Sequence, residues 1–126
     1  MKKELTSHDR MDGIVNAVPL EKLIDMAQEE CAELIQALSK IKRAMDGTGQ
    51  NPTVLSINDA WAQARGEYTD LDLAIDAINH GSFNAKHDSA HCIWVNDALY
   101  AQKMDRWYQR LVKSGAIKEG GADETY

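Results

Sequence analysis

Aromatic residues and prolines are both scarce in this chain of 126 residues. Phe, Trp and Tyr together make up 6% of the sequence, and the only prolines are Pro19 and Pro52. Aromatic side chains favour strands, and a proline inside a helix breaks it. Because strand formers and helix breakers are both few, we predict an all-α fold.

Cysteines and long apolar runs are scarce too. Cys31 and Cys92 form no CxxC pair and lie on different predicted helices, which is typical of small, reduced, buried side chains. No apolar run approaches the length of about 20 residues that spans a membrane. The first residues, Met1 to Glu4, lack the apolar stretch of a signal peptide. We therefore expect a cytoplasmic protein with no membrane partner.

The charge of the chain limits its partners. The formal net charge is −6, which argues against a nucleic acid polymer, because the phosphate backbone attracts basic surfaces. A single nucleotide is still compatible, since a bound cation reverses the sign of a site. Apolar residues make up 44% of the sequence and charged residues 27%, which is ordinary for one soluble globular domain.

Apolar residues recur at helical spacing in three long stretches. We expect helices over about 19–45, 57–79 and 89–114. Ser56 is a good N-cap for the second of these helices, and Gly81 is a natural residue to follow its end. Strand signals are too short to count. The predicted architecture is an antiparallel bundle of three long helices plus short helices.

Residues outside this bundle have weaker patterns. We expect an arm or a short helix over 1–18, a loop over 46–56 and a flexible tail over 116–126, which leaves a helical domain at 19–115.

The helices are apolar on more than one side, as buried or multiply packed helices are. We therefore expect a homo-oligomer, either a dimer or a tetramer built from dimers.

Two short acidic words interrupt the apolar stripes of the first two helices. They are Glu29-Glu30-Cys31-Ala32-Glu33 and Glu67-Tyr68-Thr69-Asp70. Each word places two carboxylates three residues apart, so both project from one side of a helix. The stripes that contain them are Leu23, Ala27, Glu30, Leu34, Leu38 and Ile41, and Ala64, Glu67, Leu71, Ala74 and Ile78.

Carboxylates on an apolar helix face are costly to bury, and several together repel each other unless a cation lies among them. Oxygen ligands alone are typical of Mg²⁺ or Mn²⁺ and of phosphate chemistry. Solvated helix faces are the ordinary alternative, and Glu29, Asp72 and Asp76 fit it. A di-iron carboxylate bundle would need Glu-x-x-His on two helices, which is missing here.

The pair EExxE and ExxD, read here in EECAELIQALSK and EYTDLDLAID, resembles the MazG-like all-α nucleoside triphosphate pyrophosphohydrolases. That superfamily includes the dimeric dUTPases and the phosphoribosyl-ATP pyrophosphatases. The resemblance covers about residues 20–112, although the segment between the words, residues 34–66, is longer than is usual. It implies Mg²⁺-dependent hydrolysis between the α- and β-phosphates of a nucleotide. The implied metal ligands are Glu30, Glu33, Glu67 and Asp70.

Basic residues on the third predicted helix are candidates for holding phosphates. Lys103, Arg106 and Arg110 share one helix face, and members of the family place basic residues near this end of the helix. Their alternative role is a solubilising surface. Arg65, just before the second acidic word, could also reach the site. Asn96 could bind a sugar or a base edge, or make a hydrogen bond in the core.

Histidines near the start of the third predicted helix do not form a convincing zinc site. His87 and His91 are four residues apart and Cys92 follows, but no second ligand pair with suitable spacing accompanies them. The glycines form neither a P-loop nor a GxGxxG pattern, so a glycine loop is not expected to hold phosphates.

The leading hypothesis is therefore a Mg²⁺-dependent pyrophosphohydrolase that acts on a nucleoside or deoxynucleoside triphosphate, with Mn²⁺ as a possible substitute. Glu29 or Glu33 is the candidate for orienting or deprotonating the attacking water. A second hypothesis is a non-enzymatic helical module whose acidic helices dock a basic partner. It predicts exposed positions for Glu30 and Glu67 and no dependence on Mg²⁺.

Overall fold

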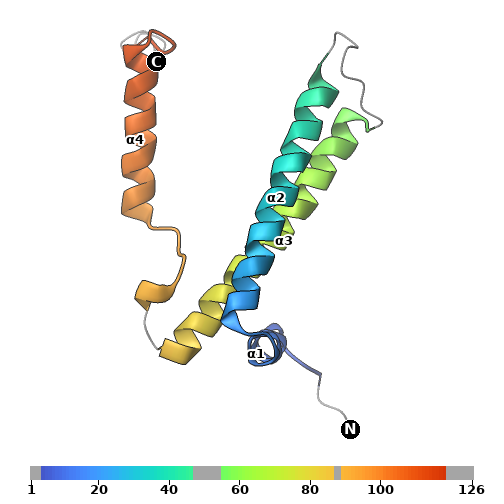
Figure 1. Cartoon of the computed structure of the whole chain (residues 1–126). Coiled ribbons are helices and arrows are strands. Elements are labelled where there is room, and N and C mark those ends of the chain that lie inside the picture. The colour runs from blue at the N-terminus through green and yellow to red at the C-terminus, as the bar shows by residue number, and fades with distance from the viewer. Residues whose placement is uncertain (1–3, 47–54, 87–88, 119–126) are drawn as a thin grey trace. The chain divides into compact units, whose positions relative to one another are not determined.

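The computed structural model describes residues 4–46, 55–86 and 89–118. Its helices are α1 (Ser7–Ala17), α2 (Leu20–Met45), α3 (Ile57–Lys86) and α4 (Asp97–Lys113), with a short 3₁₀ helix, η1 (Ser89–His91), before α4 (Figure 1). The described residues contain no strand. The predicted all-α class is confirmed.

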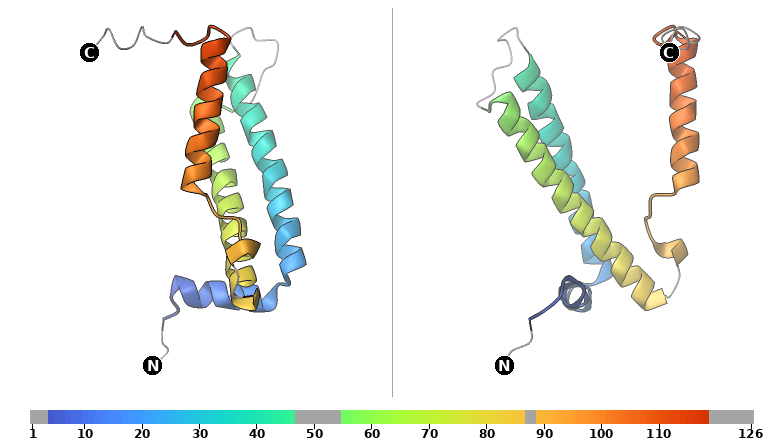
Figure 2. Two further views of the ribbon diagram at one scale, coloured as in Figure 1. Left: turned by 90° about the vertical axis from the view of Figure 1, so that its left-hand side faces the viewer. Right: turned by 180° about the vertical axis from the view of Figure 1, so that it is seen from behind.

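The chain divides into two compact units, Met1–Ile93 and Trp94–Tyr126. In the first unit, α2 and α3 run antiparallel and pack along their length, and α1 packs across α3 (Figure 2). The second unit consists of α4 and the residues around it, and none of the residues of α4 is buried within that unit.

Local capping explains where several helices begin and end. The Thr6 hydroxyl accepts a hydrogen bond from the Asp9 N–H, and the Asp9 carboxylate accepts one from the Thr6 N–H, both at 3.0 Å. These two bonds form a capping box, and the bonds from Thr6 lower the pKa of Asp9. The Ser56 hydroxyl accepts from the Asp59 N–H at 3.1 Å, which confirms Ser56 as the N-cap of α3. Gly115, with φ of 86°, follows the end of α4.

The core of the first unit lies between α2 and α3 and is made largely of alanine. It has two clusters of buried residues, one near α1 and one near the opposite end of the helix pair. Small side chains let the two helix backbones lie close together. The two clusters contain Leu23, Ala27, Ala74, Ala77 and Ile78, and Ala37, Ile41, Ala60 and Ala64.

The predicted core stripe on α2 is correct except near its end. Leu38 is 48% exposed, and its neighbour Ala37 is buried instead. The reason is that α3 presents Ala60 and Ala64 at this level, so the contact there is with a small residue one position earlier on α2.

Two predicted helix ends are wrong. The second long helix does not stop before Gly81 but continues to Lys86. A Cβ atom on Gly81 would lie 3.6 Å from Val15 Cβ and 3.9 Å from Leu23 Cδ1, so Gly81 is a contact point with α1 and α2 rather than a helix end. The third long helix begins at Asp97, not near 89, because residues 92–96 are not helical.

A buried asparagine explains why the backbone at Ile93 is not helical. Asn79 is 2% exposed, and its side chain donates to the Ile93 carbonyl at 3.0 Å and accepts from the Ile93 N–H at 2.6 Å. This pair of bonds holds the backbone at Ile93 against α3 in a non-helical conformation. The position of Asn79 in the chain gave no sign of such a distant partner.

The remaining predictions on chain organisation can be compared with the structure only where they fall on the described residues. A short helix within residues 1–18 is confirmed by α1. Most of the predicted loop at 46–56 and of the tail at 116–126 lies outside the described residues, and the limits of the 19–115 domain stay a prediction. Among the described residues, no helix is both long and apolar enough to cross a membrane.

Candidate metal centre

Three of the four predicted metal ligands come together between α2 and α3. Glu30 on α2 and Glu67 and Asp70 on α3 each offer a carboxylate oxygen, and these oxygens all lie within 4.8 Å of one another. Glu30 and Glu67 are half-buried and Asp70 is exposed. The cluster therefore opens to solvent on one side, as a site that admits a ligand must.

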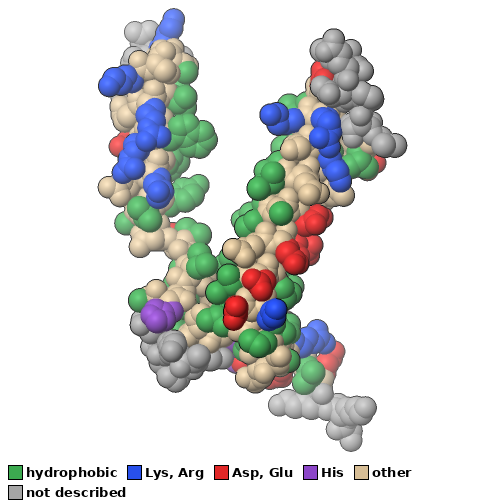
Figure 3. All heavy atoms as spheres, viewed as in Figure 1, with side chains coloured by type: hydrophobic (Ala, Val, Ile, Leu, Met, Phe, Trp, Pro, Cys, Tyr) green, Lys and Arg blue, Asp and Glu red, His purple; other side chains and the backbone are tan. Residues whose placement is uncertain are grey.

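The packing of the two helices explains why these carboxylates converge. Glu30 follows Ala27 by three residues on α2, and Glu67 follows Ala64 by three residues on α3. Both alanines are buried in the contact between the helices. Residues three apart share a helix face, so the carboxylates enter the same contact, midway between the two apolar clusters. Acidic side chains gather at this level of the helix pair in Figure 3.

The pKa of Glu30 is raised by its surroundings. Partial burial raises its pKa above the usual value of 4.5, and the charges of Asp70, Glu67, Glu33 and Glu29 raise it further. Glu30 and Asp70 also line a hollow of about 240 Å³ whose other walls are apolar. An apolar wall and four like charges both disfavour the ionised carboxylate in the absence of a cation.

The donor set suits a hard divalent cation. All three groups are carboxylates, which are the preferred ligands of Mg²⁺ and Mn²⁺. A bound cation would offset the mutual repulsion that raises the pKa of Glu30. The cluster leaves further coordination positions open, and Mg²⁺ commonly fills such positions with water and substrate phosphates.

The remaining acids of the first word lie beside the cluster rather than in it. Glu29 and Glu33 are exposed, and neither joins the group of ligand atoms within 4.8 Å. Both are close enough for their charges to contribute to the raised pKa of Glu30. Glu33 as a direct metal ligand, and Glu29 or Glu33 as the base, stay predictions.

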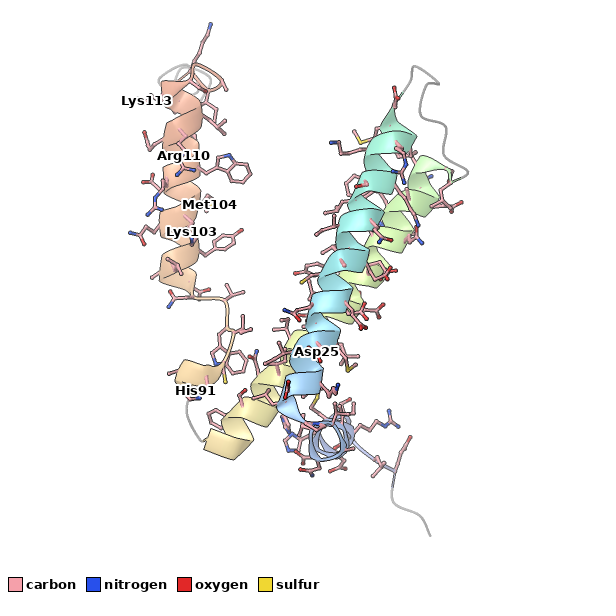
Figure 4. The ribbon with its side chains drawn as sticks, viewed as in Figure 1. Asp25, His91, Lys103, Met104, Arg110 and Lys113 are labelled. Atoms are coloured by element: carbon pink, nitrogen blue, oxygen red, sulfur yellow. The ribbon has the colours of Figure 1, made fainter. Side chains whose placement is uncertain are left out.

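The predicted phosphate-binding residues belong to the second unit. Lys103, Arg106 and Arg110 are exposed on α4, and Lys103, Arg110 and Lys113 follow one another along this helix (Figure 4). Arg106, Arg110 and Lys113 line one shallow hollow on the surface of α4, whereas Lys103 does not. Their contact with a phosphate stays a prediction.

Asn96 has a local role in the structure. Its side chain accepts a hydrogen bond from the Leu99 N–H at 2.9 Å and so caps the start of α4. The two roles predicted for Asn96, a ligand contact and a hydrogen bond in the core, both assumed a mid-helix position, and that position is wrong. A side chain that caps a helix still has donor groups for a ligand, so the ligand contact stays a prediction.

Arg65 lines a different hollow from the carboxylates. It borders an apolar depression of α2 and α3 together with Trp61 and Tyr68, and that hollow does not include Glu30 or Asp70. Residues two positions apart in a helix point in directions about 200° apart around its axis. This explains why Arg65 and Glu67 project to different sides of α3. A contact of Arg65 with a ligand at the carboxylates stays a prediction.

One cluster of polar residues was not found from the sequence. His8 and Asp12 on α1 meet His80 on α3, with ligand atoms within 4.8 Å of one another. The i, i+4 spacing of His8 and Asp12 was a visible signal, but their partner lies 68 residues from Asp12. Of the histidines considered before, His91 lies in η1 and His87 lies outside the described residues.

The cysteines differ from the expected buried pair. Cys31 is exposed on α2, and Cys92 is half-buried. The Cys92 thiol donates a weak hydrogen bond to the Asn79 carbonyl at 3.6 Å, so it adds to the contacts that hold residues 92 and 93 on α3.

Comparisons with known proteins found no match for this chain among protein-family models, curated proteins or solved structures. The resemblance to the MazG-like pyrophosphohydrolases rests on the two acidic words, and the site must be interpreted from its own chemistry.

Proposed function

We propose that this protein is a nucleoside triphosphate pyrophosphohydrolase that depends on Mg²⁺ or Mn²⁺. The observation that carries the proposal is the convergence of Glu30, Glu67 and Asp70, whose oxygens lie within 4.8 Å of one another. The half-buried position of Glu30 and Glu67 supports it further, because charged groups on a packed helix face are unfavourable without a counter-ion.

The proposal gives each group a role. Glu30, Glu67 and Asp70 would hold the cation, which would supply positive charge to the phosphate oxygens. Glu29 or Glu33, exposed beside the cluster, would accept a proton from the water that attacks the α-phosphorus. Lys103 with Arg106 or Arg110 would stabilise the charge that develops on the departing pyrophosphate. The products would be a nucleoside monophosphate and pyrophosphate.

The direct test is an assay of pyrophosphate release with a panel of nucleoside and deoxynucleoside triphosphates. We expect at least one to be hydrolysed in the presence of Mg²⁺ or Mn²⁺, and EDTA to abolish the reaction. Release of single phosphate, or full activity in EDTA, would contradict the mechanism. The panel also identifies the base and sugar that the site prefers.

A non-enzymatic docking module for a basic partner is the alternative, and the exposed acids Glu29, Glu33 and Asp70 are the observation that favours it. Thermal melting separates the two proposals, because only a ligand that binds the folded state raises the melting temperature. Mg²⁺ together with a non-hydrolysable nucleotide should stabilise the pyrophosphohydrolase. An unchanged melting temperature would favour the docking module.

We further propose that the chain forms a homodimer or a tetramer of dimers. Large apolar side chains on the surface of the first unit support this. Four of them on α2 and α3 are 43–65% exposed, namely Ile24, Ile35, Trp61 and Leu73. Apolar surface of this kind marks an interaction site. Sedimentation should show a species larger than one chain at micromolar concentration, and a stable monomer would contradict the proposal.

A further inference from the structure

We propose that His8, Asp12 and His80 form a second metal site, which takes Zn²⁺ or a similar transition metal. His80 Nε2 lies 2.6 Å from Asp12 Oδ1, and His8 Nε2 lies 3.4 Å from Asp12 Oδ2. The two imidazole rings meet edge to face, with their centroids 5.2 Å apart. Two imidazoles and one carboxylate thus each present a ligand atom to a single small region, with these atoms within 4.8 Å of one another.

The three residues are held there by the packing of α1 on α3 (Figure 1). His8 and Asp12 are one turn apart on α1, so their side chains share a face. His80 is supplied by α3, and its side chain is only 18% exposed. Near it, Gly81 of α3 lies beside Val15 of α1. The ligand set is therefore assembled by tertiary structure and does not depend on long flexible side chains meeting by chance.

The distances are close to those of a metal site. With Zn–N and Zn–O bonds of about 2.0–2.2 Å in a tetrahedron, neighbouring ligand atoms lie about 3.3 Å apart. The separation of 3.4 Å between His8 Nε2 and Asp12 Oδ2 already has this value. The separation of 2.6 Å between His80 Nε2 and the other oxygen, Asp12 Oδ1, is that of a hydrogen bond. It would lengthen by less than 1 Å when a metal replaced the shared proton.

The ligand chemistry differs from that of the carboxylate cluster. Imidazole nitrogens favour Zn²⁺ and related transition metals, whereas oxygen ligands alone favour Mg²⁺ and Mn²⁺. Three protein ligands leave at least one position for water or another group, as in open zinc sites. Because the site joins α1 to α3, bound metal would also stabilise the first unit. This inference is independent of the proposed pyrophosphohydrolase activity.

The experiment titrates the full chain with Co²⁺, a coloured substitute for Zn²⁺, in a large excess of Mg²⁺ that competes for the carboxylate cluster. We expect the strong visible absorption of four-coordinate Co²⁺ to saturate at one ion per chain, and Zn²⁺ to abolish it. Calorimetry with Zn²⁺ gives the affinity. His80→Gln and His8→Gln should each weaken Zn²⁺ binding at least about tenfold, in the range of measured losses around metal sites.

Two controls make the assignment specific. His91→Gln removes another imidazole of the first unit that lies outside the cluster, and it should leave Zn²⁺ affinity unchanged. Glu67→Gln alters the carboxylate cluster and should leave the Co²⁺ spectrum unchanged. If Glu67→Gln abolishes the spectrum while His8→Gln does not, the transition metal binds at the carboxylates and the inference is wrong.

The competing explanation is a hydrogen-bonded link between α1 and α3 that never binds metal. Under that explanation Co²⁺ gives no strong absorption, and Zn²⁺ affinity is the same in His8→Gln and in the unchanged protein. Either result overturns the inference. His8 is 74% exposed, so His8→Gln is expected to fold even if His80→Gln does not, and it decides the outcome in that case.

Discussion

Replacement of Glu67 by glutamine is the sharpest perturbation of the carboxylate cluster. The amide keeps the shape of the side chain and removes one of the three charges that meet within 4.8 Å. In the proposed function, this takes away one of three protein ligands of the cation. Because changes in the partners that merely orient a ligand already cost about 10–100-fold in metal affinity, loss of a direct ligand should cost about 100-fold or more.

That loss is measurable as a change in melting temperature. Mg²⁺ at 100 times its dissociation constant stabilises the folded state by about 2.7 kcal/mol. For a domain of roughly 60–100 residues, each kcal/mol raises the melting temperature by about 4–8 °C, so the unchanged protein should gain about 10–20 °C. A 100-fold weaker site leaves about 0.4 kcal/mol at the same Mg²⁺ concentration, or roughly 2–3 °C.

The assay is a pair of melting curves, one in Mg²⁺ and one in EDTA, beside a pyrophosphate assay. In EDTA, Glu67→Gln should be as stable as the unchanged protein or more stable, because it relieves repulsion among like charges. Asp76→Asn is the matched control: Asp76 is exposed on α3, outside the cluster and about 180° from Glu67 around the helix. A full Mg²⁺ shift in Glu67→Gln, or an equal loss in Asp76→Asn, would refute the assignment of the metal face.

Four further predictions concern stability. Gly66 lies inside α3 with no atom within 4 Å of an added Cβ, so Gly66→Ala should raise the free energy of unfolding by about 0.5–1 kcal/mol, measured by urea denaturation. Gly115 has φ of 86°, so Gly115→Ala should loosen the last turn of α4 and speed its amide hydrogen exchange. Leu23 is 2% exposed, and Leu23→Ala should cost about 2–5 kcal/mol in the same urea experiment. The pKa of Glu30 is raised in the folded protein above its usual value of 4.5. At pH values between 4.5 and the raised pKa, the folded state therefore binds more protons than the unfolded state. The metal-free protein should therefore lose stability as the pH rises through this window. Glu30→Gln should remove that part of the pH dependence in melting curves recorded with EDTA, and an identical pH profile in the variant would contradict the assignment.

Much of the helical structure could be predicted because the signals are local. The N-cap at Ser56 acts through a hydrogen bond that reaches only three residues along the chain. The alignment of Glu30 with Ala27, and of Glu67 with Ala64, follows from the helical period alone. For this reason the sequence indicated that the two acidic words face the contact between α2 and α3.

The end of α3 shows where local signals fail. Gly81 reads as a helix terminator, but in the structure it is a point of contact with Val15 and Leu23. Asn79, two residues before it, binds the backbone of Ile93 and so delays the start of α4. Such contacts join residues far apart in the chain, and their free energy outweighs the local preference for a helix end.

The sequence by itself determined the helical class, the register of the acidic words on α2 and α3, and most of the helix boundaries. Only the tertiary structure decided that Glu30, Glu67 and Asp70 form the close group while Glu33 stays beside it. It also decided that His80 meets Asp12 across 68 residues of chain. The physical reason is that capping and periodicity are fixed by neighbours within one helical turn, whereas the distance between side chains on different helices depends on how closely those helices pack.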